Sequence, residues 1–220
     1  MIHPGAFVNL TQLQELNLSR NNITKIQPGA FVNLPLLQNL KLTKNRITMI
    51  QEGTFADLVQ LKELRLKQNQ ITMIQPSLFS NLSQLKSLVL SYNPIREFHP
   101  VLFANLTRIA ALLLHNNQIT MIQAGLFVNL TQLEHVNLSY NQITIILPGT
   151  FANLPRLFAL ELNNNQISII QSGSFANLSR LQLLDLSLET LCLDIKSFSN
   201  IPGLVPSFDK CFILRLVPLK

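Results

Sequence analysis

The chain has 220 residues, of which 47% are hydrophobic and 13% are charged, and its formal net charge is +6. The hydrophobic fraction is too high for a disordered chain, which cannot bury enough apolar surface to fold. No apolar run approaches the roughly 20 residues that a membrane-spanning helix requires, so the composition favours a folded chain without a membrane span.

The first residues fit the second half of a repeat rather than a signal peptide, because they lack a basic start and an apolar stretch. Gly5 and Phe7 match Gly29 and Phe31, which lie 24 residues later. We therefore expect a partial N-terminal repeat without a cap over residues 1–12. Its open apolar end at Phe7 would allow a dimer to form through this end.

An asparagine recurs every 24 residues without an insertion, and it organises the rest of the chain. Around each copy the frame is L-x-x-L-x-L-x-x-N-x-I-x-x-I, followed by a Phe and then a Leu. A fixed period of 20–29 residues with this pattern is typical of leucine-rich repeats. The sequence predicts an α/β-type solenoid over residues 13–188, with about eight strands. The expected fold is a horseshoe with a parallel sheet on the concave face and an irregular or short helical convex side. The seven asparagines are Asn21, Asn45, Asn69, Asn93, Asn117, Asn141 and Asn165.

Within each repeat, the segment x-L-x-L-x predicts a short strand with its leucines inward and the intervening side chains outward. The chain then turns away, which leaves buried N–H and C=O groups without partners in the sheet. An asparagine side chain offers donors and an acceptor, so we expect the Asn column to satisfy these groups as a structural ladder. One phenylalanine per repeat is expected to fill the convex side as a stack. These are Phe7, Phe31, Phe55, Phe79, Phe103, Phe127, Phe151 and Phe175.

The ladder stops at Glu189, and residues 189–220 are expected to form a C-terminal cap and tail. Cys192 and Cys211 lie in this segment, and an even count there fits one disulfide in an oxidising compartment. The alternative is a pair of free buried thiols.

Outward strand positions differ between repeats while framework positions hardly change, so the outward positions are available for binding. At the centre of the strands the side chains run from basic through apolar to acidic, from Lys41 through Val89 to Asp185. Binding hot spots favour Tyr and Arg around a central patch. The alternative is that the basic run is a solvated surface. We predict ligand-binding residues on the concave face at Arg20, Lys41, Lys44, Arg65, Lys67, Val89, Tyr92, Leu113, His115, His135 and Tyr140.

Catalytic and metal chemistry find little support. His115 and His135 lie on adjacent predicted strands but differ by four positions along them, which is about 13 Å at about 3.3 Å per residue. Two histidines so far apart cannot share a metal ion. Glu161 and Asp185 lie on an open wall without a cleft to shift a pKa. We expect no enzymatic activity, no metal and no cofactor.

Charge is unevenly distributed along the chain. Residues 1–100 contain ten Lys and Arg against five Asp and Glu, whereas residues 101–188 contain three of each kind. An excess in one half favours a local anionic contact over general nucleic-acid binding, so we expect no nucleic acid partner.

Eight N-x-[ST] sequons are present, and most fall in the repeated F-x-N-L-[ST] turn, where Asn and Ser or Thr also serve the turn geometry. The repeated turn sequence is therefore the stronger explanation for the set of sequons, although some of these sites would carry glycan in a secreted protein. They are Asn9, Asn17, Asn22, Asn81, Asn105, Asn129, Asn137 and Asn177.

The chain resembles extracellular leucine-rich repeat proteins of the 24-residue typical class. The segments Leu-Ser-Tyr-Asn-Gln-Ile-Thr at 138–144 and Pro-Gly-Thr-Phe-Ala-Asn-Leu at 148–154 are similar to those of variable lymphocyte receptors and Toll-like receptor ectodomains. The resemblance covers about residues 2–188 and implies a secreted or cell-surface recognition module with an immune role. Its implied ligand is a protein antigen or a microbial glycan, glycolipid or lipopolysaccharide-like molecule. The alternative is a structural adhesion or matrix protein that assembles through its flank or its open N-terminal end.

Overall fold

The computed structural model describes residues 1–186 of the chain. Leu188, Cys192, Cys211 and the expected boundary at residue 189 lie outside the described residues. The described part contains twelve short strands. They are β1 (Glu15–Asn17), β2 (Lys25–Ile26), β3 (Asn39–Lys41), β4 (Met49–Ile50), β5 (Glu63–Arg65), β6 (Ser87–Val89), β7 (Ala111–Leu113), β8 (His135–Asn137), β9 (Ile145–Ile146), β10 (Ala159–Glu161), β11 (Ile169–Ile170) and β12 (Leu183–Asp185).

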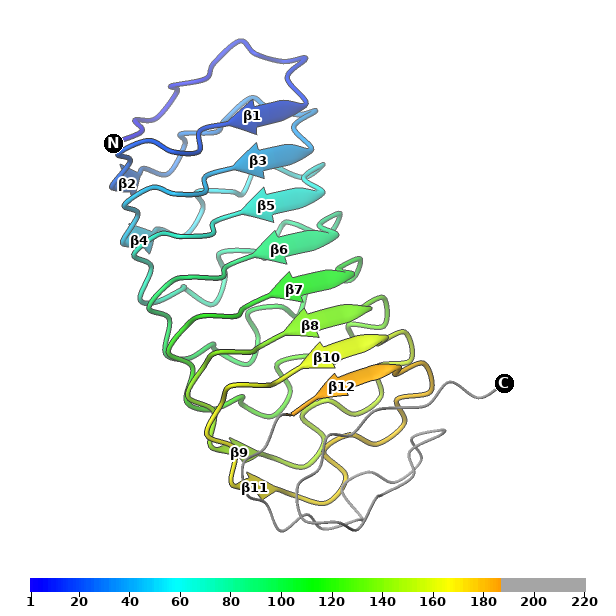
Figure 1. The fold of residues 1–220 in the computed structure, drawn as a ribbon. Coiled ribbons are helices and arrows are strands. Elements are labelled where there is room, and N and C mark those ends of the chain that lie inside the picture. Colours follow the sequence, from blue (N-terminus) through cyan, green and yellow to red (C-terminus); the bar gives the residue numbers. More distant parts are fainter. Residues whose placement is uncertain (187–220) are drawn as a thin grey trace.

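Eight of these strands form one parallel sheet in the order β1-β3-β5-β6-β7-β8-β10-β12 (Figure 1). Each residue pairs with the residue 24 positions later, as in the pairing of Leu64 with Leu88. Two further two-stranded sheets, β2-β4 and β9-β11, lie on the flank of the solenoid. The predicted leucine-rich repeat solenoid with a parallel sheet is confirmed. The return segments between strands are turns, and no helix occurs among the described residues.

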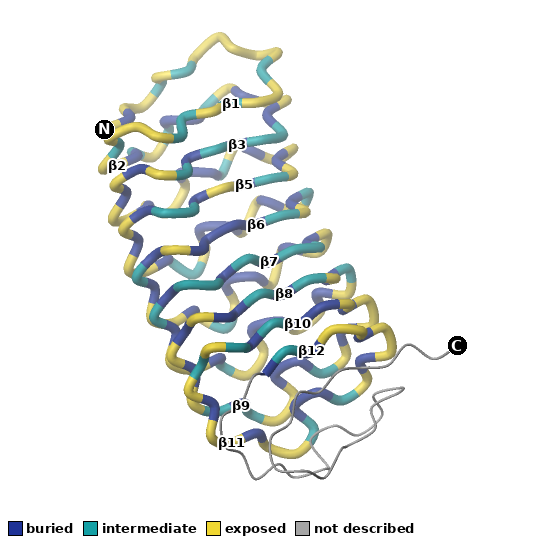
Figure 2. Tube along the Cα trace, in the orientation of Figure 1, coloured by how far each residue is buried: buried dark blue, intermediate teal, exposed yellow. Residues whose placement is uncertain are grey.

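The inward leucines form a continuous core. Leu40, Leu64, Leu88, Leu112 and the equivalent residues of the later strands are buried, whereas Leu16 in the first repeat is only partly buried. Figure 2 shows buried and half-buried residues along the sheet, whereas the first turn, at the N-terminal end, is mostly exposed. Each repeat is therefore stabilised chiefly by burial against its two neighbours, as expected for a solenoid.

The asparagine column is a buried hydrogen-bond ladder, as predicted. The Nδ2 of Asn69 donates to the carbonyl of Leu66 in its own repeat (3.0 Å) and to that of Leu42 in the preceding repeat (3.0 Å). Its Oδ1 accepts the N–H of Ile47 (3.1 Å). One side chain therefore satisfies three backbone groups of two repeats. The same three contacts recur at Asn45, Asn93, Asn117, Asn141 and Asn165.

The phenylalanine column is stacked with ring centroids 5.4–6.5 Å apart, but the stack is interrupted in the middle. Phe98 occupies the position where other repeats have Ile, and its ring packs against Phe103 at 5.5 Å and 50°. The two halves of the stack, which end at Phe79 and begin at Phe103, are thus separated by a different packing arrangement.

The described residues contain no helix long and apolar enough to cross a lipid bilayer. At the N-terminal end, Ile2 forms a parallel bridge with Ile26 and is buried. The first turn therefore packs onto the first complete repeat, although Leu10 remains 44% exposed.

Candidate functional site

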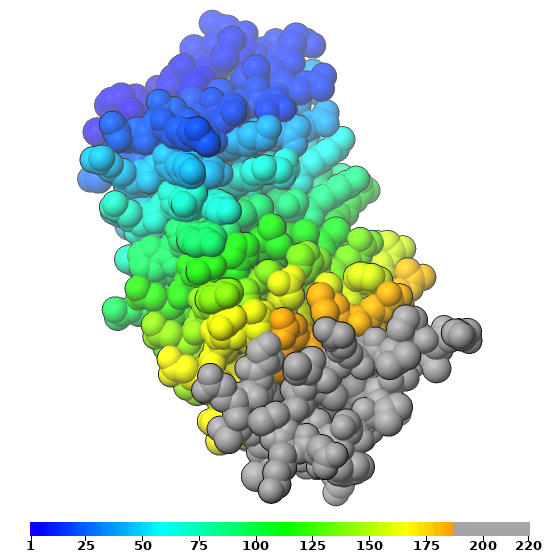
Figure 3. Space-filling model, viewed as in Figure 1, coloured from blue at the N-terminus to red at the C-terminus, as the bar shows by residue number. Residues whose placement is uncertain are grey.

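The outward side of the eight-stranded sheet is the concave wall, which we define as residues 14–20 and the equivalent segments that follow at intervals of 24 residues, as far as residue 186. Each strand and its flanking residues in this set form one rung. Figure 3 shows the wall as a continuous surface from the N-terminal end to β12. Because no insertion interrupts the period, each position forms a lane of side chains that crosses all the strands.

The predicted basic residues lie on this wall, but two of them are already paired with acidic neighbours. Lys41 Nζ lies 2.5 Å from Glu15 Oε1, and Arg65 Nε lies 2.6 Å from Glu63 Oε1. These pairs partly neutralise the cations that we expected to be most available. Arg20 and Lys44, at the rim of the wall, are exposed.

Two further basic residues on the wall were not among the predicted binding residues, because they precede the strands. Lys62 and Lys86 lie immediately before β5 and β6, in the lane at which the chain enters the wall. Both are exposed, and Lys62 Nζ donates to Gln38 Oε1 at 2.9 Å. The same lane contains Phe158, which is 50% exposed. The 24-residue period was sufficient to find all three.

An aromatic and cationic cluster occupies the middle of the wall. Lys67 Nζ lies 5.0 Å from the centroid of the Tyr92 ring. The ring of His115, on the next rung, meets Tyr92 edge-on at 5.5 Å. The sequence correctly placed these three residues near one another. Val89 is different, because it is only 8% exposed between Arg65 and Leu113 on the neighbouring strands. It therefore offers less apolar surface than we expected.

The rim lane, where the chain leaves the wall, has a left-handed backbone in every described repeat. The φ angles are positive, between 54° and 59°, at Arg20, Lys44, Gln68, Tyr92, Asn116, Tyr140 and Asn164. Among residues with a side chain, this conformation favours Asn and Asp and disfavours large side chains. The fold alone explains Asn116 and Asn164. It does not explain the tyrosines or the basic residues in this lane.

The far half of the wall is acidic. Glu161 accepts a hydrogen bond from Asn137 Nδ2 at 2.8 Å, and its other oxygen lies 2.7 Å from His135 Nε2. Burial lowers the pKa of His115 below its ordinary value, and the nearby Lys67 lowers it further. The sequence did not predict the contact between His135 and Glu161, since it depends on how the two side chains are oriented.

Two buried polar side-chain atoms at the centre of the wall have no hydrogen-bond partner. They are Ser91 Oγ and His115 Nδ1, which occupy the same lane on adjacent rungs. The equivalent Ser139 differs, because its Oγ donates to Asn137 Oδ1 at 2.7 Å. At this lane, the polar side chains at the centre of the wall thus have fewer hydrogen bonds than the equivalent side chain in the repeat that follows.

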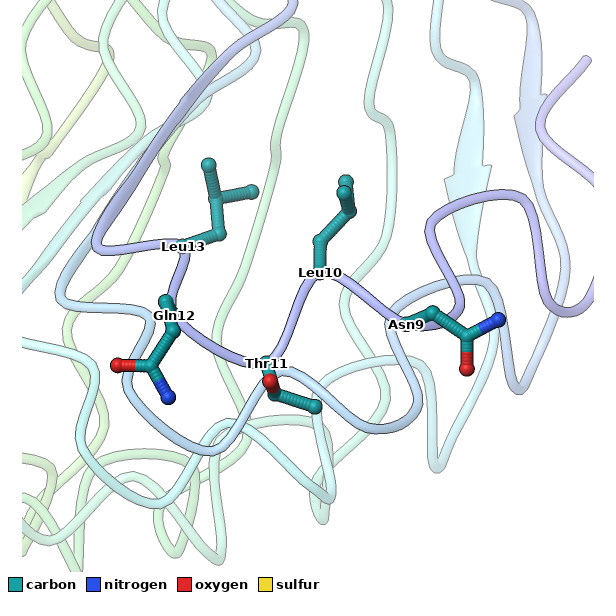
Figure 4. A pocket seen from close by; sticks show the side chains of 5 residues that line it. All are labelled: Asn9, Leu10, Thr11, Gln12 and Leu13. Atoms are coloured by element: carbon teal, nitrogen blue, oxygen red, sulfur yellow. The ribbon is translucent and has the colours of Figure 1, made fainter.

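Other features of the described residues add no chemical site. No group of three or more His, Cys, Asp or Glu within residues 1–186 is placed to hold a metal ion. A hollow of about 390 Å³ follows the continuous segment from Asn9 to Leu13 at the N-terminal end (Figure 4). Its side chains carry no titratable group, so this hollow reflects the exposed first turn.

Comparisons with known proteins place these features in context. The profile of the family described as "Leucine rich repeat" matches residues 1–47, 35–95, 59–119, 107–167 and 148–191. No curated protein matches the chain. Among solved structures, a chain in "Crystal structure of TLR13-ssRNA13 complex" is similar, with a TM-score of 0.80 and 30% identity over 86% of this chain. This chain spans 27% of the length of that one.

One expectation from the sequence is wrong. We had excluded a nucleic acid partner because the excess of positive charge lies in one half of the chain. The similar solved structure is a complex with single-stranded RNA, so a repeat protein of this shape occurs together with a nucleic acid. An uneven charge distribution is therefore not a ground for that exclusion.

Proposed function

The chain belongs to the leucine-rich repeat family, and on that premise we propose that it is an extracellular recognition module of the immune-receptor type. It binds its ligand on the concave wall. The ligand is a protein or an anionic microbial glycan or glycolipid. The single-stranded RNA in the similar complex adds a further anionic candidate.

The rim lane carries the proposal. A left-handed backbone costs roughly 1–2 kcal/mol for a residue other than Gly, Asn or Asp. Arg20, Lys44, Tyr92 and Tyr140 nevertheless occupy that conformation and extend into the solvent from the edge of the wall. Tyr and Arg are also the side chains that dominate binding energy in protein interfaces. A recognition role accounts for large side chains at positions where the fold favours Asn.

The basic side of the wall supports an anionic ligand. Lys62 and Lys67 lie on the rung of β5 and Lys86 lies on the rung of β6. Arg20 and Lys44 lie at the rim of the two preceding rungs. A patch of one sign raises the local concentration of oppositely charged ligands and speeds their association. The carboxylates of Glu15 and Glu63 reduce the contribution of Lys41 and Arg65.

A binding measurement with two defined probes tests this proposal. Heparin represents a sulfated glycan and poly-uridine represents a single-stranded RNA. The triple variant Lys44→Glu, Lys67→Glu, Lys86→Glu should bind either probe at least about tenfold more weakly at low salt, since each contact with an anionic polymer is salt-dependent. Lys25→Glu lies on the flank in β2 and serves as the control. Equal binding by the triple variant and the wild type would remove the electrostatic part of the proposal and leave a protein ligand.

A structural adhesion or matrix role is the second candidate, and one observation favours it. One lane along the flank is mostly apolar, with Met49, Met73, Met121 and Ile169 each 42–56% exposed. Lys25 and Glu97 occupy the same lane. Assembly through this lane would make the particle size rise with concentration. That rise would be abolished by Met73→Gln and would be insensitive to charge reversal on the wall.

A further inference from the structure

The concave wall changes sign between β6 and β7. The rungs of β1, β3, β5 and β6 carry seven Lys and Arg and two Glu, a net charge of +5. The described residues in the rungs of β7, β8, β10 and β12 carry three acidic side chains and no Lys or Arg, a net charge of −3. The cations are Arg20, Lys41, Lys44, Lys62, Arg65, Lys67 and Lys86, and the acids of the second half are Glu134, Glu161 and Asp185.

A surface with this charge order is complementary to itself when it is turned end to end. A two-fold axis that lies parallel to the strands, between β6 and β7, places β6 against β7 of a second copy and β5 against β8. It likewise places β3 against β10 and β1 against β12. We propose that the concave wall is also a contact surface for a second copy of this chain, with the two walls face to face and the repeat order reversed.

The uninterrupted 24-residue period decides which side chains meet, because each lane is opposed to the same lane of the partner. Lys62 is opposed to Glu134, and Lys41 is opposed to Glu161. Glu63 is opposed to His135, and Val89 to Leu113 at the axis. Each of these contacts occurs twice in a two-fold dimer, as in any isologous interface. No two like charges among the described residues are directly opposed in this arrangement.

The other two-fold arrangement is disfavoured. An axis along the stack would place each rung against the same rung of the second copy. The central lane would then meet itself, because this axis reverses the strand direction. Lys41 would oppose Lys41, Arg65 would oppose Arg65, and Glu161 would oppose Glu161. Such like-charge contacts discriminate strongly against wrong arrangements.

The area of the wall fits a specific but weak dimer. Eight strands at about 4.8 Å and a width of about 20 Å give roughly 760 Å² on each copy. Two copies would bury about 1,500 Å², which lies within the usual range of about 1,200–2,000 Å² for specific interfaces. The small apolar centre and the exposed ion pairs keep the expected affinity low.

This inference goes beyond the proposed function and needs no ligand. It adds that the dimer covers the wall on which a ligand would bind, so that self-association and ligand binding compete. The two claims fail separately. A protein that binds heparin and stays monomeric contradicts only the dimer, and a dimer that ignores heparin and poly-uridine contradicts only the anionic ligand.

A charge-exchange experiment tests the arrangement. Sedimentation velocity should show that wild-type protein dimerises at about 0.05 M salt and dissociates at about 1 M salt, where the screening length falls to about 3 Å. Lys62→Glu alone and Glu134→Lys alone each oppose like charges twice, so each should weaken dimerisation about tenfold or more. An equimolar mixture of these two variants should form a heterodimer of wild-type affinity, because both opposed pairs are then restored.

Controls exclude trivial explanations. Within one chain Lys62 and Glu134 lie three strands apart, at about 14 Å, so they do not contact each other. Recovery of dimerisation in the mixture would therefore come from contacts between two chains. Lys25→Glu makes the same charge change on the flank and should leave dimerisation unchanged. Thermal melting should give the same midpoint for all variants. A wild type that stays monomeric at low salt, a mixture that does not recover, or equal disruption by Lys25→Glu would overturn the proposal.

Discussion

The ammonium group of Lys67 lies over the ring of Tyr92 on the next rung, 5.0 Å from the ring centroid. His115 meets the same ring from the following rung. Tyr92 is thereby held in place before any ligand arrives. Tyr140, two rungs further on, has no such ring contact and is 53% exposed. The rim lane thus presents one aromatic ring that is positioned by its neighbours and one that is free.

We expect Tyr140→Asn to stabilise the fold and to weaken ligand binding. The backbone of Tyr140 is left-handed, with φ at 54°, and Asn adopts this conformation more readily. The free energy of unfolding in urea should rise by about 1 kcal/mol, since the strain removed is of that order. The reverse change in the neighbouring repeat, Asn116→Tyr, should lower it by a similar amount. Equal stability of both variants and the wild type would show that the rim lane carries no strain.

The repeat period explains how much could be predicted from the sequence. Asn69 and Leu64 recur at a fixed interval, so their roles in the ladder and the core follow from backbone hydrogen bonding and from the alternation of a strand. The position of Tyr92 beside His115 follows from the same period. Lys62 was not among the predicted residues, but its lane, one residue before each strand, follows from the same period.

The remaining features depend on side-chain orientation and could not be derived from spacing. Lys41 could equally have pointed to solvent, but it pairs with Glu15. Val89 sits at an outward position yet is buried by its longer neighbours. Phe98 replaces an Ile, and the resulting break in the phenylalanine stack depends on how a larger ring packs.

The asparagine ladder makes a prediction that distinguishes the middle from the end of the solenoid. Asn69→Ala leaves an N–H and two carbonyls without their partner, and it should reduce the free energy of unfolding by about 2–4 kcal/mol, as expected for buried unsatisfied groups. Asn21 is exposed, and its contacts are confined to Leu18 and Ser19 of its own repeat. Asn21→Ala should therefore have a much smaller effect in the same urea titration. Equal losses at both positions would contradict a ladder that depends on burial.

Ser91 and Ser139 form a matched pair of equivalent residues in different repeats. Ser91 Oγ is buried without a partner, whereas Ser139 Oγ is bonded to Asn137. Removal of an unsatisfied hydroxyl relieves a desolvation penalty of about 1–3 kcal/mol, so Ser91→Ala should leave the melting temperature unchanged or raise it. Ser139→Ala should lower it. A loss at Ser91 equal to that at Ser139 would mean that the Ser91 hydroxyl has a partner in solution.

The environment of His115 makes stability depend on pH. Burial lowers its pKa below the ordinary value of 6.5, and the ammonium of Lys67 and the ring of His135 act in the same direction. Glu161 opposes them. The neutral imidazole is therefore the form that the folded wall prefers.

The sign of the effect follows from this preference. As pH falls through about 6.5, the unfolded chain takes up a proton at His115 before the folded chain does. The free energy of unfolding must then decrease until pH passes below the lowered pKa of the folded state, where the difference becomes constant. His115→Gln removes this contribution, so its melting temperature should fall less than that of the wild type between about pH 7.5 and about pH 5. Differential scanning calorimetry measures the difference, and the contributions of the carboxylates cancel because both proteins share them. Identical pH profiles would show that His115 titrates alike in the folded and unfolded chains.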